Sequence, residues 1–422
     1  MYYTQIVIIC ALISSSSLII GYDFYKSPRK VIYNLSSYSL IYAIFYFGVP
    51  FLNIEFLYSY FGYRISESSL VESRFYSIIT LLIFFLLYLF LRKKNSDITM
   101  NHTGPFFRTP NIIPIILILF CTSIYLYIIA NIGSKLIINF SDRVAAHAIY
   151  AEYEVNFKIV IVFYLNLYCI YLLSLKKYFH GVNKLFQLTP LIGISCELLS
   201  GGRDLLFTYV LYLFIFNSIK FNNKKIKKTS MVVLIILSLM LFIRYNLTND
   251  NSETNIVYHI YSFFAEFYHT AFTTSYAIEY NLHDYTNSFY YIMYPALKFF
   301  LPLLNLFGES LNIPWYADII STHIGRHFGF AGNTITESYY YWGPLGAVLY
   351  PMIIALIVLL HNNRRYYSTG FFFFIVLAIN LRHFFRGSFW DNYTSLIIWF
   401  FIFNVIFLSL NNKSKILMKN EK

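Results

Sequence analysis

His323–Gly346 reads HIGRHFGFAGNTITESYYYWGPLG, and this stretch decides how the rest of the chain is interpreted. It ends a long polar and aromatic connection and leads directly into an apolar run. Arg326, Asn333, Thr334 and Glu337 therefore cluster where a membrane helix is predicted to begin. Polar groups at a membrane boundary are costly unless they have partners or a function. We predict that the stretch forms the floor of an active site.

The apolar run that follows is expected to form one crossing over residues 336–360. Gly343 and Gly346 lie inside it, where small residues would allow close helix packing. Tyr340 and its aromatic neighbours have two interpretations. They form an interfacial aromatic belt, which needs no ligand, or they stack on sugar rings.

A structural explanation competes with the catalytic one. Thr334 and Glu337 have the spacing of a capping box, in which each side chain bonds a backbone N–H at the start of the helix. That motif would account for both residues without any chemistry. It accounts for neither Arg326 nor Asn333.

The composition is that of a membrane protein. The 422 residues are 58% hydrophobic and only 12% charged, and many runs reach the roughly 17–25 residues that a bilayer crossing needs. We therefore predict an all-α, polytopic membrane protein with one domain over residues 1–422. Eleven crossings are expected, at about residues 2–21, 31–52, 75–91, 112–132, 157–175, 185–200, 205–219, 230–245, 336–360, 370–383 and 392–410.

Charge sets the orientation and argues against a nucleic-acid partner for a chain of net charge +12. Alternate loops and the C-terminal tail hold 21 of the 32 basic residues but only three of the 20 acids. Cytoplasmic loops carry such an excess of Lys and Arg. The N-terminus is therefore predicted outside the cytoplasmic membrane and the C-terminus inside. The loops predicted inside are residues 22–30, 92–111, 176–184, 220–229 and 361–369.

The one long connection, residues 246–335, is predicted to be external. Loops of this length are usually functional. Its segment 289–307 is apolar but is interrupted by Pro295, Lys298 and Pro302, which indicates a re-entrant or interfacial course. If this segment and residues 256–280 both cross, the count becomes thirteen and the orientation is unchanged.

Most basic residues on the predicted outer side are arginines, whereas lysine predominates inside. Topology requires only positive charge, so this choice indicates recognition of an anion by a planar, bidentate donor. Pairing with the external acids is the alternative. The outer arginines are Arg64, Arg74, Arg143, Arg203, Arg244, Arg326, Arg382 and Arg386.

Three of these arginines have informative surroundings. Arg203 follows two glycines and precedes a helix, so the N–H groups of that helix could help bind a diphosphate; a tight turn in which Arg203 pairs with Asp204 or Glu197 is the alternative. Arg244 stands at the mouth of the long loop, where it binds substrate or extends to the interface. Arg143 lies in the outer loop at 133–156, which is predicted to be partly helical.

Arg382 and Arg386 lie in the short outer hairpin between the last two crossings. Two arginines four residues apart share one helix face, so they could form a second anion clamp. An ion-pair knot with Asp391 is the alternative. The four cysteines stand singly in apolar runs, and no nucleotide or metal motif occurs. No metal or cofactor is therefore expected.

Several of these motifs together resemble the bacterial O-antigen polymerase family. They are GGRD at 201–204, GRHFGFAGNT at 325–334, NTITESYYYWGPLG at 333–346 and RHFFRGSFWDN at 382–392, with Arg244 opening the long loop. O-antigen ligases usually show a His immediately before the Asn of this motif. Gly332 occupies that place, which favours a polymerase over a ligase.

The resemblance implies a GT-C-like membrane fold and a metal-independent glycosyltransferase. Its substrates would be two undecaprenyl-diphosphate-linked oligosaccharides at the outer face, in O-antigen, capsule or exopolysaccharide synthesis, with a chain-length regulator as a possible partner. Glu337, Arg203 and Arg326 would be catalytic. Substrate would be bound by Arg143, Arg244, Asn333, Thr334, Tyr340, Arg382 and Arg386.

A lipid-linked oligosaccharide flippase is the rival function. Transporters place charged residues along a central cavity at mid-helix. In this sequence the predicted crossings are almost free of charge, and the polar residues collect on one side. That distribution favours an enzyme.

Overall fold

The structure is a computed structural model, and its described residues form sixteen helical elements and one further short helix. The described residues are 2–52, 65–92, 112–139, 145–146, 148–149, 155–175, 185–199, 202, 204–219, 221–248, 265–285, 288–289, 292–293, 316–325, 332–362, 368–387, 389, 392–403 and 405. The elements are α1 (Tyr2–Lys26), α2 (Pro28–Ile32), α3 (Leu35–Ala43), the π-helix η1 (Ile44–Gly48), α4 (Val49–Leu52), α6 (Glu67–Arg92), α7 (Ile112–Ile138), α9 (Val155–Leu175), α11 (Thr189–Leu199), α12 (Asp204–Ser218), α13 (Asn223–Thr248), α15 (Ala265–Glu279), α17 (Tyr316–His323), α18 (Thr334–Gly346), α19 (Leu349–Asn362), α20 (Ser368–Arg386) and the helix Asn392–Phe403. Over these ranges there is no strand, which confirms the all-α prediction.

Within the described residues, the apolar runs predicted to cross the membrane lie on helices. Four helices are long and apolar enough to span a bilayer: Tyr3–Lys26, Leu35–Leu52, Glu67–Arg92 and Ile112–Ile138. Several shorter apolar helices accompany them. The chain is therefore a multi-pass, α-helical membrane protein. The count of eleven crossings and the GT-C-like fold remain predictions.

The expected single continuous helix at 336–360 is wrong. The run forms two helices, α18 and α19, which meet at an angle of 110°. Gly343 lies inside α18, near its end, in the non-helical conformation φ 66° and ψ −165°, and Pro344 follows it without a backbone N–H to continue the hydrogen-bond ladder. The glycine therefore allows a sharp bend instead of close packing between straight helices.

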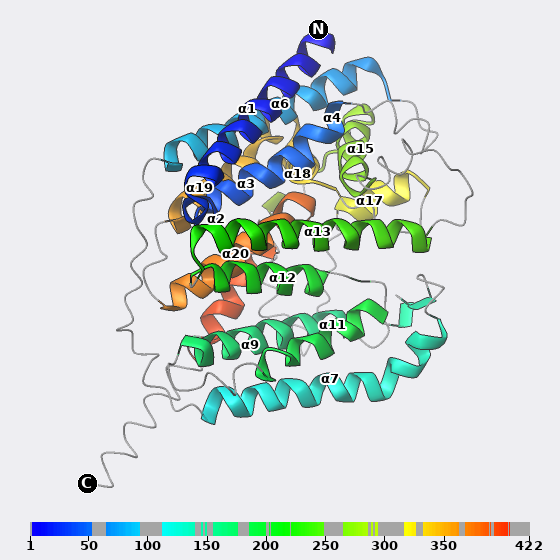
Figure 1. Cartoon of the computed structure of the whole chain (residues 1–422). Coiled ribbons are helices and arrows are strands. Elements are labelled where there is room, and N and C mark those ends of the chain that lie inside the picture. Colours follow the sequence, from blue (N-terminus) through cyan, green and yellow to red (C-terminus); the bar gives the residue numbers. More distant parts are fainter. Residues whose placement is uncertain are drawn as a thin grey trace. The chain divides into compact units, whose positions relative to one another are not determined.

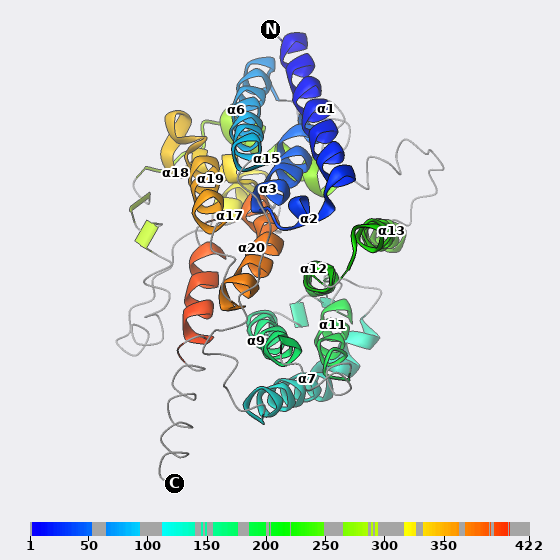
Figure 2. The same ribbon diagram turned by 60° about the vertical axis from the view of Figure 1, so that its left-hand side comes forward.

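The chain divides into two compact units, each built from segments far apart in sequence. The first comprises residues 1–98, 218–364 and 376–396, and the second comprises 99–217, 365–375 and 397–422. In the second unit α7, α9 and α11 pack side by side (Figures 1 and 2). A Cβ atom on Gly193 of α11 would lie 2.8 Å from the Tyr125 ring of α7. Here a small residue does permit close helix approach.

Helix α6 organises the first unit, where it packs against α1 and α3 (Figure 1). Its buried residues recur every three or four positions and form one continuous face: Leu70, Ser73, Arg74, Ser77, Leu81, Phe84, Tyr88 and Leu91. Exposed apolar side chains such as Leu86 and Phe90 lie elsewhere on the same helix. Exposed apolar side chains on a long apolar helix suit contact with lipid.

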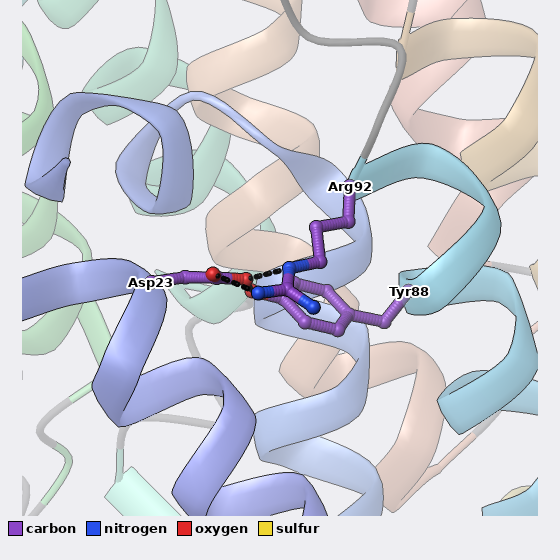
Figure 3. A network of polar contacts seen from close by, with 3 residues as sticks. All are labelled: Asp23, Tyr88 and Arg92. Atoms are coloured by element: carbon purple, nitrogen blue, oxygen red, sulfur yellow. Dashed lines mark hydrogen bonds and ion pairs between the residues drawn. The ribbon is translucent and has the colours of Figure 1, made fainter. Parts of the chain in front are cut away.

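Helices α1 and α6 run in the same direction, as contacts near both ends of the pair show. Near the start of the two helices, Gln5 donates to the carbonyl of Val71 at 3.0 Å. Near the other end, Asp23 accepts hydrogen bonds from the Tyr88 hydroxyl at 2.7 Å and from Arg92 Nη2 at 2.6 Å (Figure 3). The predicted orientation requires this shared direction for the first and third crossings.

Two loops that are both predicted to be cytoplasmic also meet. Arg29 Nη2 donates to the Phe221 carbonyl at 2.6 Å, and Lys227 Nζ lies 4.3 Å from the centre of the Tyr25 ring. The loops at 22–30 and 220–229 therefore lie on the same side of the first unit. The contact is consistent with the charge-based orientation and does not depend on it.

Reporter fusions provide the direct check of this orientation. We expect fusions at residues 225 and 415 to read cytoplasmic and a fusion at 250 to read external, because Lys and Arg concentrate in the first two regions. Alkaline phosphatase and green fluorescent protein fusions give opposite signals on the two sides and serve as mutual controls. An external signal at 225 would place Arg203 on the cytoplasmic side and contradict the assignment of the substrate face.

The predicted external loop at 246–335 carries helices of its own. Helix α15 packs against α6, η1, α4 and α18. Its end is fixed by Glu279, whose carboxylate accepts the Ser66 backbone N–H at 2.9 Å and the Ser66 hydroxyl. Burial raises the pKa of Glu279, but the hydrogen bonds from Ser66 and Ser69 outweigh it and lower the pKa below its usual value. The predicted re-entrant course of 289–307 lies almost wholly outside the described residues.

Candidate active site

The first turn of α18 is capped by Asn333, and Glu337 takes no part in the cap. The Asn333 side chain accepts the N–H groups of Ile335 and Thr336, at 2.9 and 3.0 Å. Thr336 completes a capping box by accepting the Asn333 N–H. The predicted Thr334–Glu337 box is therefore wrong by one residue. The structural explanation that competed with a chemical role for Glu337 is removed.

Threonines of α15 hold this capped turn in place. The Thr274 hydroxyl donates to Asn333 Oδ1 at 3.1 Å and lies 2.7 Å from the Thr336 hydroxyl. Asn333 Nδ2 donates to the Thr270 carbonyl at 3.1 Å. All four side chains are fully buried. The network fixes the position and direction of the α18 N-terminus within the first unit.

Thr334 and Glu337 connect the same turn to the arginine-bearing end of α20. The Thr334 hydroxyl donates to the Phe384 carbonyl at 2.9 Å, and a Glu337 carboxylate oxygen accepts the Phe389 N–H at 2.8 Å. Arg382 and Arg386 flank the first contact in sequence, and both are half-buried. Two segments predicted to share one site are thus brought together by direct hydrogen bonds.

This junction lies beside the middle of α6 and beside η1. The Phe385 ring packs against Phe84 of α6 at 4.9 Å and against Phe47 of η1 at 5.5 Å, between ring centres. Arg382 interacts electrostatically with Tyr42 of α3. The position of this hairpin at the outer membrane boundary stays a prediction. The polar turn belongs to the bent pair α18 and α19, and discontinuous helices form binding sites in many membrane proteins.

Ser338 satisfies backbone groups that the bend leaves without helix partners. Its hydroxyl donates to the Gly346 carbonyl and accepts the Tyr350 N–H at 3.2 Å. Buried backbone groups require such partners, especially where water is scarce. The bend is therefore stabilised within the first unit, because the buried Ser338 side chain of α18 bonds backbone groups on both sides of it.

Replacing Gly343 with alanine is expected to destabilise this bent pair. A Cβ atom would lie 2.0 Å from the Tyr285 hydroxyl oxygen, and the backbone conformation is one that glycine adopts almost alone, so the cost is about 1–3 kcal/mol or more. Thermal unfolding of the purified protein in detergent measures the loss. Gly21→Ala is the control, because a Cβ atom at that position would have no other atom within 4 Å. Equal stability of the two variants would contradict the assigned role of Gly343.

The tyrosines after Glu337 are buried within the protein. Tyr339, Tyr340 and Tyr341 are 2%, 5% and 0% exposed, and the Tyr340 carbonyl accepts the Asp284 N–H at 2.7 Å. Such burial fits neither an aromatic belt facing lipid nor an open surface for sugar stacking. Tyr340 therefore contributes to the packing beneath the site, and direct contact with substrate would require these side chains to move.

The other predicted arginines are described only in part. Arg143, Arg203 and Arg326 lie outside the described residues, and so does the side chain of Arg244, whose backbone belongs to α13. Arg74, by contrast, is fully buried, and its Nε donates to the Phe51 carbonyl at 3.1 Å. This outer arginine binds the protein's own backbone.

The carboxylate of Glu197 occupies the start of α12, next to the turn that precedes Arg203. Glu197 Oε2 accepts the Leu205 N–H at 2.8 Å, and the Glu197 carbonyl accepts the Gly202 N–H at 2.9 Å. A Cβ on Gly202 would lie 2.6 Å from Glu197 Cγ. The group that comes close to the Gly202 backbone is thus the Glu197 side chain. A diphosphate bound at the start of α12 would have to share that helix end with the Glu197 carboxylate.

Sequence reasoning missed three parts of this site. Thr270 and Thr274 have the i, i+4 spacing that places them on one helix face, but nothing in that spacing indicates which helix they meet. Phe389 contributes its backbone N–H to Glu337, and the type of a residue gives no indication of such a backbone contact. In the described part of the chain, no group of three or more His, Cys, Asp or Glu side chains is placed to hold a metal ion.

The fold and the site together define a multi-pass membrane protein with a buried, carboxylate-bearing helix turn inside its bundle. The chain belongs to the O-antigen polysaccharide polymerase Wzy family, whose family model matches residues 1–421. In general terms it is therefore an O-antigen repeat-unit polymerase, with a glycosyltransferase-type activity in polysaccharide biosynthesis. Comparison with curated proteins gives no match, and comparison with solved structures gives none.

Proposed function

We propose that the protein joins undecaprenyl-diphosphate-linked oligosaccharide repeat units at the outer face of the bacterial cytoplasmic membrane. The growing chain is transferred from its lipid diphosphate to the non-reducing sugar of the next unit. The observation that carries this proposal is the hydrogen bond between Glu337 and the Phe389 N–H. It joins the only carboxylate of the 323–346 stretch to the segment that bears Arg382 and Arg386.

The proposed reaction is a single glycosyl transfer. An acceptor hydroxyl oxygen attacks the anomeric carbon of the donor and forms the new C–O bond. The bond from that carbon to the diphosphate oxygen breaks, and the diphosphate leaves with the electron pair. Glu337 takes the proton of the acceptor hydroxyl as general base.

Negative charge accumulates on the diphosphate oxygens as the bond breaks. Guanidinium groups that already point at these oxygens stabilise the transition state more than the ground state, and they do so without a metal. In the proposal this role falls to Arg203 and Arg326, with Arg143, Arg244, Arg382 and Arg386 binding the substrate anions. Asn333 and Thr334 hold the turn in register, as their hydrogen bonds to α15 and α20 suggest.

The Glu337 side chain of α18 is fully buried and contacts the Phe389 backbone, which follows α20. The proposal therefore includes a separation of these two elements when the acceptor binds. The Phe389 N–H bond is the contact that the acceptor hydroxyl replaces. Conformational steps of this kind commonly complete catalytic sites on substrate binding.

A lipid-linked oligosaccharide flippase is the second candidate, and one observation favours it. Helix breaks with polar groups inside the bundle, such as the 110° bend of α18 and α19, are typical of transporters. Membership of a polymerase family weighs against this candidate. An O-antigen ligase is disfavoured by the same membership and by Gly332, which occupies the position where ligases usually have His.

Deletion of the gene separates the two candidates. A strain without a polymerase still exports single units, so its surface glycan should be capped by one repeat unit. A strain without the flippase should display none. The surface glycan is resolved by size on a gel, and the wild-type ladder restored by the intact gene is the control. Complete loss of surface glycan would contradict the polymerase proposal.

A further inference from the structure

Tyr280 and His323 form an exposed pair of rings at the end of α15, close to the start of the predicted substrate stretch. We infer that this pair, termed here the ring platform, binds the sugar chain of a substrate. The inference rests on the proposed function and adds a glycan-binding site to it. The site is separate from the residues to which the diphosphate was assigned.

A buried tyrosine holds the platform rigid. The Tyr276 hydroxyl lies 2.9 Å from His323 Nδ1, and Tyr276 is only 3% exposed. Its ring centre lies 4.6 Å from that of Tyr280 and 5.7 Å from that of His323, and the Tyr280 and His323 centres are 5.0 Å apart. The three rings support one another, so little side-chain freedom remains to be lost on binding.

The main chain beneath Tyr280 is equally well fixed. Helix α15 ends in a Schellman motif, in which the Leu282 N–H bonds the Ala277 carbonyl at 2.8 Å and the Asn281 N–H bonds the Ile278 carbonyl at 3.1 Å. Asn281 adopts φ 49°, the left-handed conformation this motif requires. Tyr339 of α18 donates to Asn281 Oδ1 at 3.2 Å. The platform is thus anchored to the helix that carries Glu337.

The platform is open and has polar groups at its edge. Tyr280 is 50% exposed, and His323 is also exposed. Because Tyr276 occupies Nδ1, the second imidazole nitrogen and the Tyr280 hydroxyl are the groups that can bond sugar hydroxyls. Planar rings with polar edges match a sugar, which has an apolar C–H face bordered by hydroxyl groups. The tyrosines at 339–341 are buried, so they offer no such surface.

The described residues of the platform do not favour the diphosphate as the occupant. The two described segments that build the platform, residues 276–285 and 316–325, contain no Lys or Arg. They do contain Glu279, Asp284 and Asp318, and all three would repel phosphate groups. The surface therefore suits uncharged sugar rings.

The separation from the catalytic turn is suitable for one glycan. Helix α15 carries Thr270 and Thr274, which contact Asn333, and ends beside Tyr280. The ten residues from Thr270 to Tyr280 correspond to about 15 Å along the helix at 1.5 Å per residue. Residues 270–278 of α15 are buried, so an oligosaccharide that reacts near this turn would pass outside the helix and place its distal sugars on the platform. Binding there would retain the chain between successive additions.

Glycan binding by the purified full-length protein in detergent tests this inference. The probe is the surface polysaccharide of the host strain, cleaved from its lipid, so that no diphosphate is present. We expect Tyr280→Ala and His323→Ala each to weaken binding roughly two- to tenfold, the range that one stacked ring supplies. Tyr280→Phe keeps the ring but loses the hydroxyl, so it should weaken binding less than Tyr280→Ala does. Tyr127→Ala removes a 70% exposed tyrosine from α7 and should leave glycan binding unchanged.

The controls separate this inference from the proposed function. If Ala at position 280 lowers the yield of folded protein, Tyr280→Leu keeps the apolar volume without the ring and should show the same weakening. Unchanged binding by Tyr280→Leu and His323→Ala, in protein that still elongates glycan, would overturn the platform alone. A wild-type protein that binds polysaccharide but does not elongate lipid-linked units would overturn the polymerase proposal instead. A lower abundance in membranes with unchanged binding would assign the rings to the lipid interface and contradict the inference.

Discussion

Glu337→Gln is expected to lower the rate of repeat-unit transfer about a hundredfold or more, because an amide cannot take the proton of the acceptor hydroxyl. The structure makes this substitution selective. The Gln carbonyl oxygen can still accept the Phe389 N–H, and the helix cap belongs to Asn333 and Thr336. The free energy of unfolding should therefore change by only about 1 kcal/mol. Transfer is measured with the purified variant and lipid-linked repeat units.

Glu279→Gln is the matched control. Glu279 also accepts a backbone N–H, from Ser66 at 2.9 Å, and it too lies in the first unit. This variant should elongate glycan at the wild-type rate. Glu337→Asp keeps the charge but shortens the side chain, so it should retain part of the activity. A fully active Gln variant at 337 would remove Glu337 from the chemistry and leave the arginines as the sole catalytic groups.

The second large effect is expected from arginine-to-lysine substitutions. Arg203→Lys, Arg244→Lys and Arg326→Lys keep the charge but lose the planar, two-pronged donor geometry that matches a diphosphate. Each should lower polymer formation about tenfold or more, since a hydrogen bond to a charged group contributes about 1.5–3 kcal/mol. The measurement is the length distribution of surface glycan in the deletion strain, at matched protein levels.

Arg29→Lys supplies the comparison on the opposite, predicted cytoplasmic side. Arg29 bonds the Phe221 carbonyl and has no assigned role with substrate, so its replacement should leave the glycan ladder unchanged. Normal ladders from all three outer variants would show that these arginines serve topology or ion pairing, and the diphosphate assignment would then be wrong.

The helices themselves were predictable because the bilayer imposes a simple rule on the sequence. Runs of apolar residues must satisfy their backbone groups internally, so each of them folds as a helix. Their continuity was not predictable in the same way. The dipeptide Gly343–Pro344 is a recognised turn signal, but within an apolar run a glycine also suits close helix packing. The positive φ of Gly343 shows that the turn signal was the relevant one.

The composition of the candidate site was predictable, whereas its contacts were not. Asn333, Thr334 and Glu337 do gather at one helix start, next to the segment that bears Arg382 and Arg386. The cap was misplaced by one residue because Asn333, Thr334 and Thr336 are all acceptable capping residues, and only the backbone geometry distinguishes them. The partners from α15 depend on tertiary packing between segments about sixty residues apart, as the Thr274–Asn333 bond shows.

Transfer between purified components tests the central claim most directly. The wild-type protein is reconstituted in liposomes with one lipid-diphosphate-linked repeat unit, and glycan length and free lipid diphosphate are followed together. The polymerase account predicts glycans of increasing length, with one lipid diphosphate released for each unit joined. Movement of the intact lipid-linked unit across the bilayer, with no elongation and no diphosphate release, would contradict it.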